Sequence, residues 1–219
     1  MRNSISSQGM AGALNSLMQQ YGVFGTGVEQ LTQPLYDYQS YPTTGVSNLS
    51  FFQVPIGQSS KTLSDTNLQL AGQLPQGQVF FVTSFEIDFQ PGAVIGTAGD
   101  AETAVTSNAN DTQKVLQSGN FSFNIGTKNY LQIAPLMQLP PSFGIDVFSA
   151  LSDATTAAAT QKTVVDYARG KGDVFEVIPF AIPSNTNFTC AINWPALVTV
   201  TNQARIGAIM NGILVRNRQ

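Results

Sequence analysis

The chain has 219 residues and a mass of 23.4 kDa, a size typical of one large domain or two small ones. Only 11% of its residues are charged, against roughly 25% in an average globular protein, and the net charge of −3 gives no long-range attraction to nucleic acid. The sequence has no histidine and one cysteine, Cys190, which excludes histidine-dependent nucleophiles, histidine metal ligands and an internal disulfide.

Residues 1–45 differ in pattern from the rest and predict an N-terminal arm. Its first part is expected to be a short amphipathic helix over residues 7–21, because one apolar stripe has the i, i+3, i+4, i+7 spacing: Leu14, Leu17, Met18 and Tyr21. An extended stretch rich in Gln, Tyr and Pro follows over residues 30–44. Two hypotheses remain open for the stripe, which either docks on a neighbouring chain or apolar surface, or packs on its own domain. The first residues lack the apolar core of a secretory signal, so we expect a chain made in the cytosol without processing.

From residue 46 to residue 219 the pattern predicts a β domain. Its strongest strand signal is residues 78–89, where side chains alternate with period two and the outer face becomes polar towards the end. The last strand is apolar on both faces, so we place it centrally in its sheet. The eight expected strands are residues 47–56, 78–89, 121–125, 130–133, 174–182, 187–194, 197–201 and 205–215.

Two stretches interrupt these strands. Residues 91–118 are rich in Gly, Ala, Thr and Asn and predict a long exposed loop, whereas residues 143–172 carry helical signals. About eight antiparallel strands without βαβ alternation indicate a sandwich or a jelly roll. The expected fold is therefore all-β: a single eight-stranded jelly-roll sandwich with an N-terminal helical arm and a helical insertion.

One strand resembles a catalytic motif. Residues 85–90 are similar to the Glu-Ile-Asp-x-Glu strand of jelly-roll β-glucanases, with Glu86 at the position of the nucleophile and Asp88 at that of the middle aspartate. The acid/base position holds Gln90, which cannot donate and recover a proton as retaining hydrolysis requires. We therefore favour a structural interpretation, an outward carboxylate pair near a strand end, and do not expect a glycosidase.

The other candidate sites also have structural interpretations that we favour. Cys190 alternates with apolar residues and is expected to be a buried thiol. Glycines within residues 92–96 and 170–172 lack the spacing of phosphate-binding loops. Three acidic residues of the expected loop could ligate calcium, but they are expected to be solvated: Asp100, Glu102 and Asp111. Three basic residues form either a small phosphate-binding patch or a solvated strand end: Arg205, Arg216 and Arg218. No catalytic residue, metal or cofactor is predicted.

Two segments carry a resemblance to a known family. One is residues 119–126, Gly-Asn-Phe-Ser-Phe-Asn-Ile-Gly, which lead into Tyr130-Leu131, and the other is residues 209–216, Ile-Met-Asn-Gly-Ile-Leu-Val-Arg. Together with the predicted strands, the uncharged polar surface and the non-basic arm, they make the chain similar to jelly-roll major capsid proteins of tailless icosahedral viruses. The likeness is to the upright jelly rolls of bacteriophages and archaeal viruses that contain an internal membrane.

The resemblance implies a virion structural protein, a capsid shell subunit that self-assembles into capsomers of an icosahedral particle and has no enzymatic activity. Its implied partners are copies of itself and other capsid proteins, without direct sequence-specific binding of nucleic acid. The stripe of Leu14, Leu17, Met18 and Tyr21 would face a neighbouring subunit or the internal viral membrane. Because the helix has no Lys or Arg on its polar face, a subunit clamp is favoured. The alternatives are a carbohydrate-binding or adhesive β-sandwich module, such as a fibre tip, and a degenerate glucanase.

Overall fold

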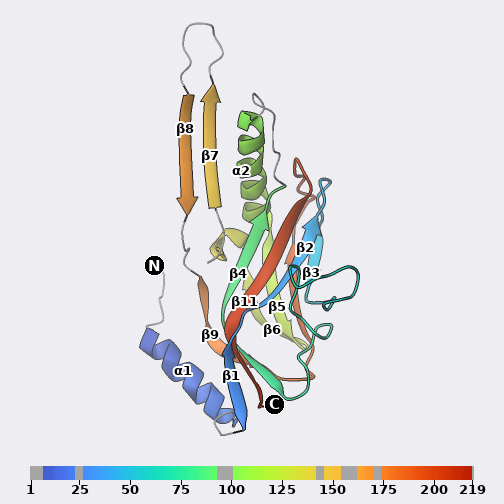
Figure 1. Cartoon of the computed structure of the whole chain (residues 1–219), viewed down its shortest axis with the longest axis vertical. Coiled ribbons are helices and arrows are strands. Elements are labelled where there is room, and N and C mark those ends of the chain that lie inside the picture. The colour runs from blue at the N-terminus through green and yellow to red at the C-terminus, as the bar shows by residue number, and fades with distance from the viewer. Residues whose placement is uncertain are drawn as a thin grey trace.

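Two antiparallel sheets face each other across an apolar core in the computed structural model, which describes residues 7–22, 27–92, 101–141, 146–153, 162–169 and 174–218 (Figure 1). The first sheet has the order β1-β11-β4-β9, with β2 also paired to β11. The second has the order β3-β10-β5-β6. The expectation of a mostly β, sandwich-like chain is thus confirmed. The first sheet comprises β1 (Val28–Thr32), β2 (Leu35–Tyr41), β4 (Gln78–Gln90), β9 (Phe175–Ile182) and β11 (Ala204–Asn217). The second comprises β3 (Asn48–Phe51), β5 (Asn120–Ile125), β6 (Lys128–Ile133) and β10 (Phe188–Asn193).

The central strand β11 organises the first sheet. It pairs with β4 along one edge, and along the other edge it pairs with β2 through residues 204–210 and with β1 through residues 213–217. Gln33 and Pro34 separate β1 from β2, and proline cannot donate to a ladder. Both strands lie in the segment that the sequence assigns to the arm, so this part of the arm is sheet.

The prediction of a strand at residues 197–201 is wrong. The backbone groups of this segment are taken by other partners: the Val200 N–H donates to the Thr43 carbonyl at 3.1 Å, and the Tyr41 hydroxyl donates to the Val198 carbonyl at 2.8 Å. The Thr201 N–H donates to the Asp111 carboxylate at 2.6 Å. The segment is therefore held without forming a ladder.

Both expected interruptions have a secondary structure that differs from the prediction. Residues 101–118, which were expected to be part of a loop, form helix α2 (Ala101–Ser118). Residues 143–172, which were expected to be helical, contain the hairpin of β7 (Asp146–Asp153) and β8 (Lys162–Arg169). In α2, Asp111 and Val115 are buried at i, i+4, a periodicity that the small polar residues around them hide. The parts of these predictions that cover residues 93–100, 142–145, 154–161 and 170–173 lie outside the described residues.

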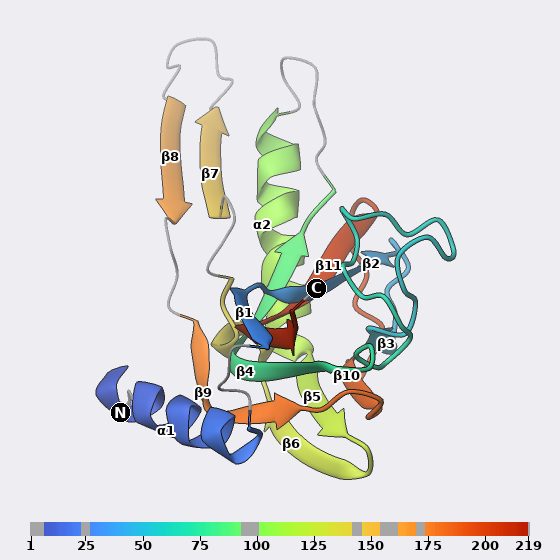
Figure 2. The same ribbon diagram turned by 60° about the horizontal axis from the view of Figure 1, so that its bottom comes forward.

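The additions to the sandwich gather at its two ends. Helix α2 and the β7–β8 hairpin extend side by side from one end, whereas α1 (Ser7–Gln20) lies against the outer face of the first sheet at the other (Figures 1 and 2). A short helix, η1 (Leu136–Gln138), follows β6, and the Ile87 N–H donates to the Leu139 carbonyl behind it at 2.9 Å. No helix in the described part of the chain is long and apolar enough to cross a membrane.

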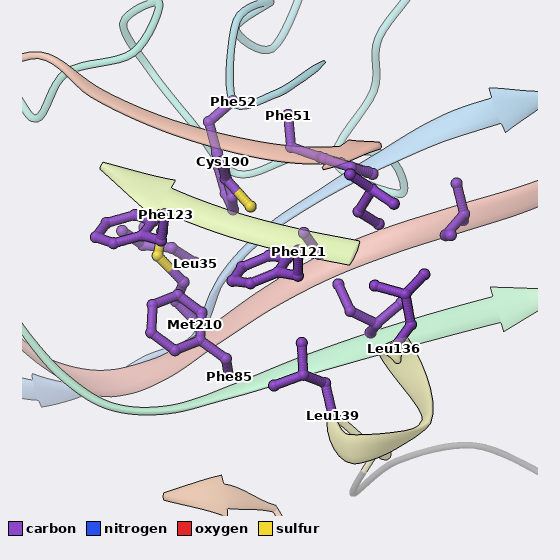
Figure 3. Packing of buried hydrophobic residues seen from close by; sticks show 14 of the residues in the cluster. Leu35, Phe51, Phe52, Phe85, Phe121, Phe123, Leu136, Leu139, Cys190 and Met210 are labelled. Carbon is purple, nitrogen blue, oxygen red and sulfur yellow. The ribbon is translucent and has the colours of Figure 1, made fainter. Parts of the chain in front are cut away.

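Aromatic side chains fill the space between the sheets. Phe85 of β4 faces Phe121 and Phe123 of β5, with ring centroids 5.4 and 5.1 Å apart (Figure 3). Phe180 of β9 contacts both Phe85 and Phe123. Aromatic pairs at these distances contribute about 0.5–1.5 kcal/mol each beyond the burial of their surface. The inner face therefore fixes the register of both sheets.

A buried ion pair attaches the long 52–77 segment to the first sheet. Asp37 of β2 is fully buried, and its carboxylate is bound by the Lys61 ammonium and accepts the Phe52 N–H at 2.7 Å. That bond holds Phe52 at φ 64, a left-handed conformation that is rare for a bulky residue. Burial raises the pKa of Asp37, while Lys61 acts in the opposite direction.

We predict that Lys61→Met lowers the free energy of unfolding by about 3 kcal/mol at neutral pH, because it leaves the Asp37 carboxylate buried without a counter-ion. A folded-state pKa raised above the unfolded value gives stability that is present at low pH and lost as the pH rises through the folded pKa. The deficit should therefore shrink in urea denaturation near pH 4 and in the double variant with Asp37→Asn. A deficit of equal size at both pH values contradicts this account.

Candidate functional site

The apolar stripe of α1 covers a patch on the outer face of the first sheet. Met18, only 2% exposed, clusters with Phe81 of β4, Ala181 of β9 and Val215 of β11. Leu14 and Leu17 pack against the same cluster, and the Tyr21 ring meets the Phe81 ring edge-on at 5.8 Å although Tyr21 is 41% exposed. Within the single chain the stripe thus contacts its own sheet. The opposite face of α1 is exposed, polar and uncharged: Asn15, Ser16, Gln19 and Gln20.

One edge of the sandwich exposes apolar side chains. The edge strands β9 and β6 meet there, with the rings of Phe180 and Tyr130 4.9 Å apart. Residues 177–179 of β9 bulge opposite the single residue Thr83, because the register moves from Val82–Phe180 to Ser84–Glu176. The side chain of Ile178 in this bulge is 71% exposed. Pro179 has no N–H, so the edge disfavours the addition of a further strand while it presents an apolar surface.

A polar cross-strand cluster lies at the end of the first sheet from which α2 extends. In β11, Gly207 pairs with Tyr38 of β2 on one side and with Asp88 of β4 on the other. A Cβ atom at Gly207 would lie 2.3 Å from the Tyr38 ring, so glycine is what allows the ring to cross β11. The Tyr38 hydroxyl donates to Asp88 Oδ2 at 2.9 Å, and the Arg205 guanidinium lies 4.2 Å from the ring centroid. Burial, and then Asp88, raise the pKa of Tyr38 above its ordinary value.

This cluster forms the base of an open hollow of about 530 Å³. Its wall is built from the ends of β2 and β4, the start of β11 and one residue of the 52–77 segment. The residues that line it are Tyr38, Gln39, Ser40, Asp65, Gln90, Pro91, Gly92, Gln203, Ala204 and Arg205. This hollow is not among the sites expected from the sequence. A glycine inside an otherwise apolar strand is the signal that indicates a close approach at Gly207.

The glucanase-like carboxylates both bond within the sheet. Glu86 lies on the outer face of the first sheet with Asp88, because it alternates with the core residues Phe85 and Ile87. It is nevertheless fully buried and accepts a hydrogen bond from the Asn211 amide, so the expected exposure is wrong for this residue. Asp88 accepts from Tyr38 and, at 2.6 Å, from the amide of Gln90. The residue at the acid/base position of the motif therefore acts as a hydrogen-bond donor to its neighbour.

The remaining candidates lie apart. Asp111 is buried and accepts the Thr201 N–H, so it is not solvated as expected. Asp100 and the side chain of Glu102 lie outside the described residues, and no group of three or more metal-ligating His, Cys, Asp or Glu side chains occurs in the described part. Cys190 is buried in the core, as predicted, and burial raises the pKa of its thiol.

The three basic residues of the expected patch do not gather in one place, because Arg205 lies far from Arg216 and Arg218. Arg205 and Arg216 lie at opposite ends of β11, about 35 Å apart at the usual rise per residue. Arg205 is paired with Asp65 at 3.1 Å, and Arg216 with Glu29 at 2.8 Å. Of the glycine-rich loops, residues 93–96 and 170–172 lie outside the described residues.

Comparison with known proteins adds no family. No family model matches the chain, and no curated protein is significantly similar to it.

We predict that Met18→Asp releases α1 from the sheet. A carboxylate cannot be buried among Phe81, Ala181 and Val215 without a large free-energy cost, and an isolated helix of 14 residues is marginal in water. In hydrogen exchange, the amides of α1 should lose protection while β5 and β10 keep theirs. Gln19→Asp places the same charge on the exposed face and should change neither the protection of α1 nor that of β5 and β10. Full protection of α1 in Met18→Asp contradicts the placement of the stripe.

We also predict that Gly207→Ala lowers the free energy of unfolding by about 1–3 kcal/mol. The new methyl group displaces the Tyr38 ring and breaks its hydrogen bond to Asp88. Gly12→Ala is a suitable control, because no atom lies within 4 Å of a Cβ at that exposed helical position, so stability should not fall. Equal stability of Gly207→Ala and the wild type in urea denaturation contradicts the close approach.

Proposed function

We propose that the chain is a jelly-roll capsid shell subunit with a structural, non-enzymatic role in the virion. Jelly rolls combine eight strands in two sheets through two Greek keys and are common in viral capsids and lectins. The orders β2-β11-β4-β9 and β3-β10-β5-β6 support this topology. In chain order, every connection among these eight strands except that between β5 and β6 crosses from one sheet to the other.

The observation that carries the proposal is that the two ends of the sandwich differ. The two insertions, α2 between β4 and β5 and the β7–β8 hairpin between β6 and β9, extend from the same end (Figure 1). Helix α1 lies at the other end. A subunit that stands upright in a shell needs such an axis, with projecting loops on the outer surface and its sides free for neighbours.

The sides of the sandwich have the chemistry of a lateral contact. We assign the edge of β9 and β6 to contact between copies of the chain, since its bulge discourages open-ended strand pairing and Ile178 and Tyr130 offer apolar area. The described surface carries few charges that would select or repel neighbours. The exposed polar face of α1 has no charged residue and fits a neighbouring subunit better than an anionic membrane.

Electron microscopy of the purified full chain tests this proposal. Wild-type protein should form capsomers or closed particles, and Ile178→Asp should leave folded, dispersed subunits because a charge is then buried at the contact. Leu63→Asp alters a similarly exposed apolar residue in the 52–77 segment and should still assemble. Assembly by Ile178→Asp contradicts the assigned edge.

Electron microscopy together with a glycan-binding assay separates the alternative function. Monodisperse monomers at high concentration that bind glycans would favour the carbohydrate-binding or adhesive module over the shell subunit.

A further inference from the structure

The hollow at the end of the first sheet is rich in planar polar groups. Three glutamines, Ser40 and the paired side chains of Asp65 and Arg205 line it, and both members of that ion pair are about one third exposed. In the described part of the chain no aromatic face is open on its base, because Arg205 covers the Tyr38 ring. Its volume lies in the usual range for small-ligand sites.

These groups keep both donors and acceptors for a ligand. Among the described residues, Arg205 makes its hydrogen bonds only through Nη2, to the Ser64 carbonyl and to Asp65, so its Nε and Nη1 keep their N–H donors. Gln203 and Gln90 use their amide nitrogens to bond Ser40 at 2.7 Å and Asp88 at 2.6 Å. The two amide oxygens remain as acceptors beside the guanidinium.

One wall of the hollow is formed where the backbone at Gly92 lies close to the backbone at Gln203. A Cβ atom at Gly92 would lie 2.4 Å from the carbonyl oxygen of Gln203 and 2.8 Å from Cβ of Asn202, so glycine brings the segment after β4 against the start of β11. The side-chain nitrogen of Asn202 is buried there without a hydrogen-bond partner among the described residues. A buried donor without an acceptor is rare in folded proteins.

The charges of the hollow favour a neutral ligand. Among the described residues, Arg205 is balanced by Asp65, and the Asp88 carboxylate accepts the hydrogen bond of the Tyr38 hydroxyl, so the lining has no excess of positive charge for an anion. A group that both donates and accepts suits a mixture of N–H donors and oxygen acceptors, and neighbouring hydroxyls can bridge a guanidinium and an amide.

We propose that this hollow binds a neutral saccharide through its hydroxyl groups. This binding goes beyond the shell function, because it concerns one subunit and needs no assembly. The hollow lies beside the end from which α2 and the β7–β8 hairpin extend. The proposed orientation places that end on the outer surface of a particle.

Saturation-transfer NMR tests the site, because it observes the ligand and works for dispersed subunits and particles alike. The full chain is mixed with neutral glucose, galactose, mannose or N-acetylglucosamine, and separately with glucuronate or N-acetylneuraminate. At least one neutral sugar should receive transfer, and the acidic sugars should receive less. Gln203→Ala and Gln90→Ala should each weaken binding by about fivefold, the loss expected for one net hydrogen bond.

The matched control is Gln132→Ala, which removes an exposed amide from β6 in the second sheet and should leave binding unchanged. Transfer to no neutral sugar, tighter binding of the acidic sugars, or equal binding by Gln203→Ala and wild type overturns the proposal. A chain that assembles but binds no sugar overturns this inference alone, and a chain that binds sugar but never assembles overturns the shell function alone.

Discussion

The aromatic layer between the sheets is the constraint on which the rest of the structure depends. Phe85 contacts Phe121 and Phe123 across the core, and Phe180 joins the edge strand β9 to the same cluster. Moving any of these strands by one residue would turn its aromatic side chains to the outer face. The inner faces therefore form a rigid unit, and the chain can add a helix, a hairpin and long connections outside it without disturbing the two sheets.

The outer face of the first sheet is specialised at its two ends by different chemistry. At one end Phe81 and Val215 make it apolar, and α1 covers them. At the other end Gly207 removes a side chain from β11, and Tyr38 can then reach Asp88 across it. One strand thus supports both a hydrophobic docking surface and a polar hollow. This division gives the first sheet two chemically distinct ends.

Alternating side chains in the sequence predicted two of the strands, β4 from residues 78–89 and β5 from residues 121–125. Burial alternates strictly in β5, whereas β4 is buried on both faces over most of its length. Periodicity failed where partners far along the chain decide the conformation: β2 is a strand because β11 pairs with it, and residues 197–201 are irregular because Tyr41 and Asp111 occupy their backbone groups. The stripe of α1 was found from the sequence, but the hollow was missed because its residues come from segments about 140 residues apart.

The proposed shell function requires that the protein act through shape and side-to-side contact, with the α2 end of the sandwich facing outward. Electron cryomicroscopy of assembled particles tests that claim most directly. We predict a shell in which each sandwich stands upright, with α2 and the β7–β8 hairpin on the outer surface and β9 at a contact between subunits. Sandwiches that lie flat in the shell, or whose α2 ends point inward, would contradict it.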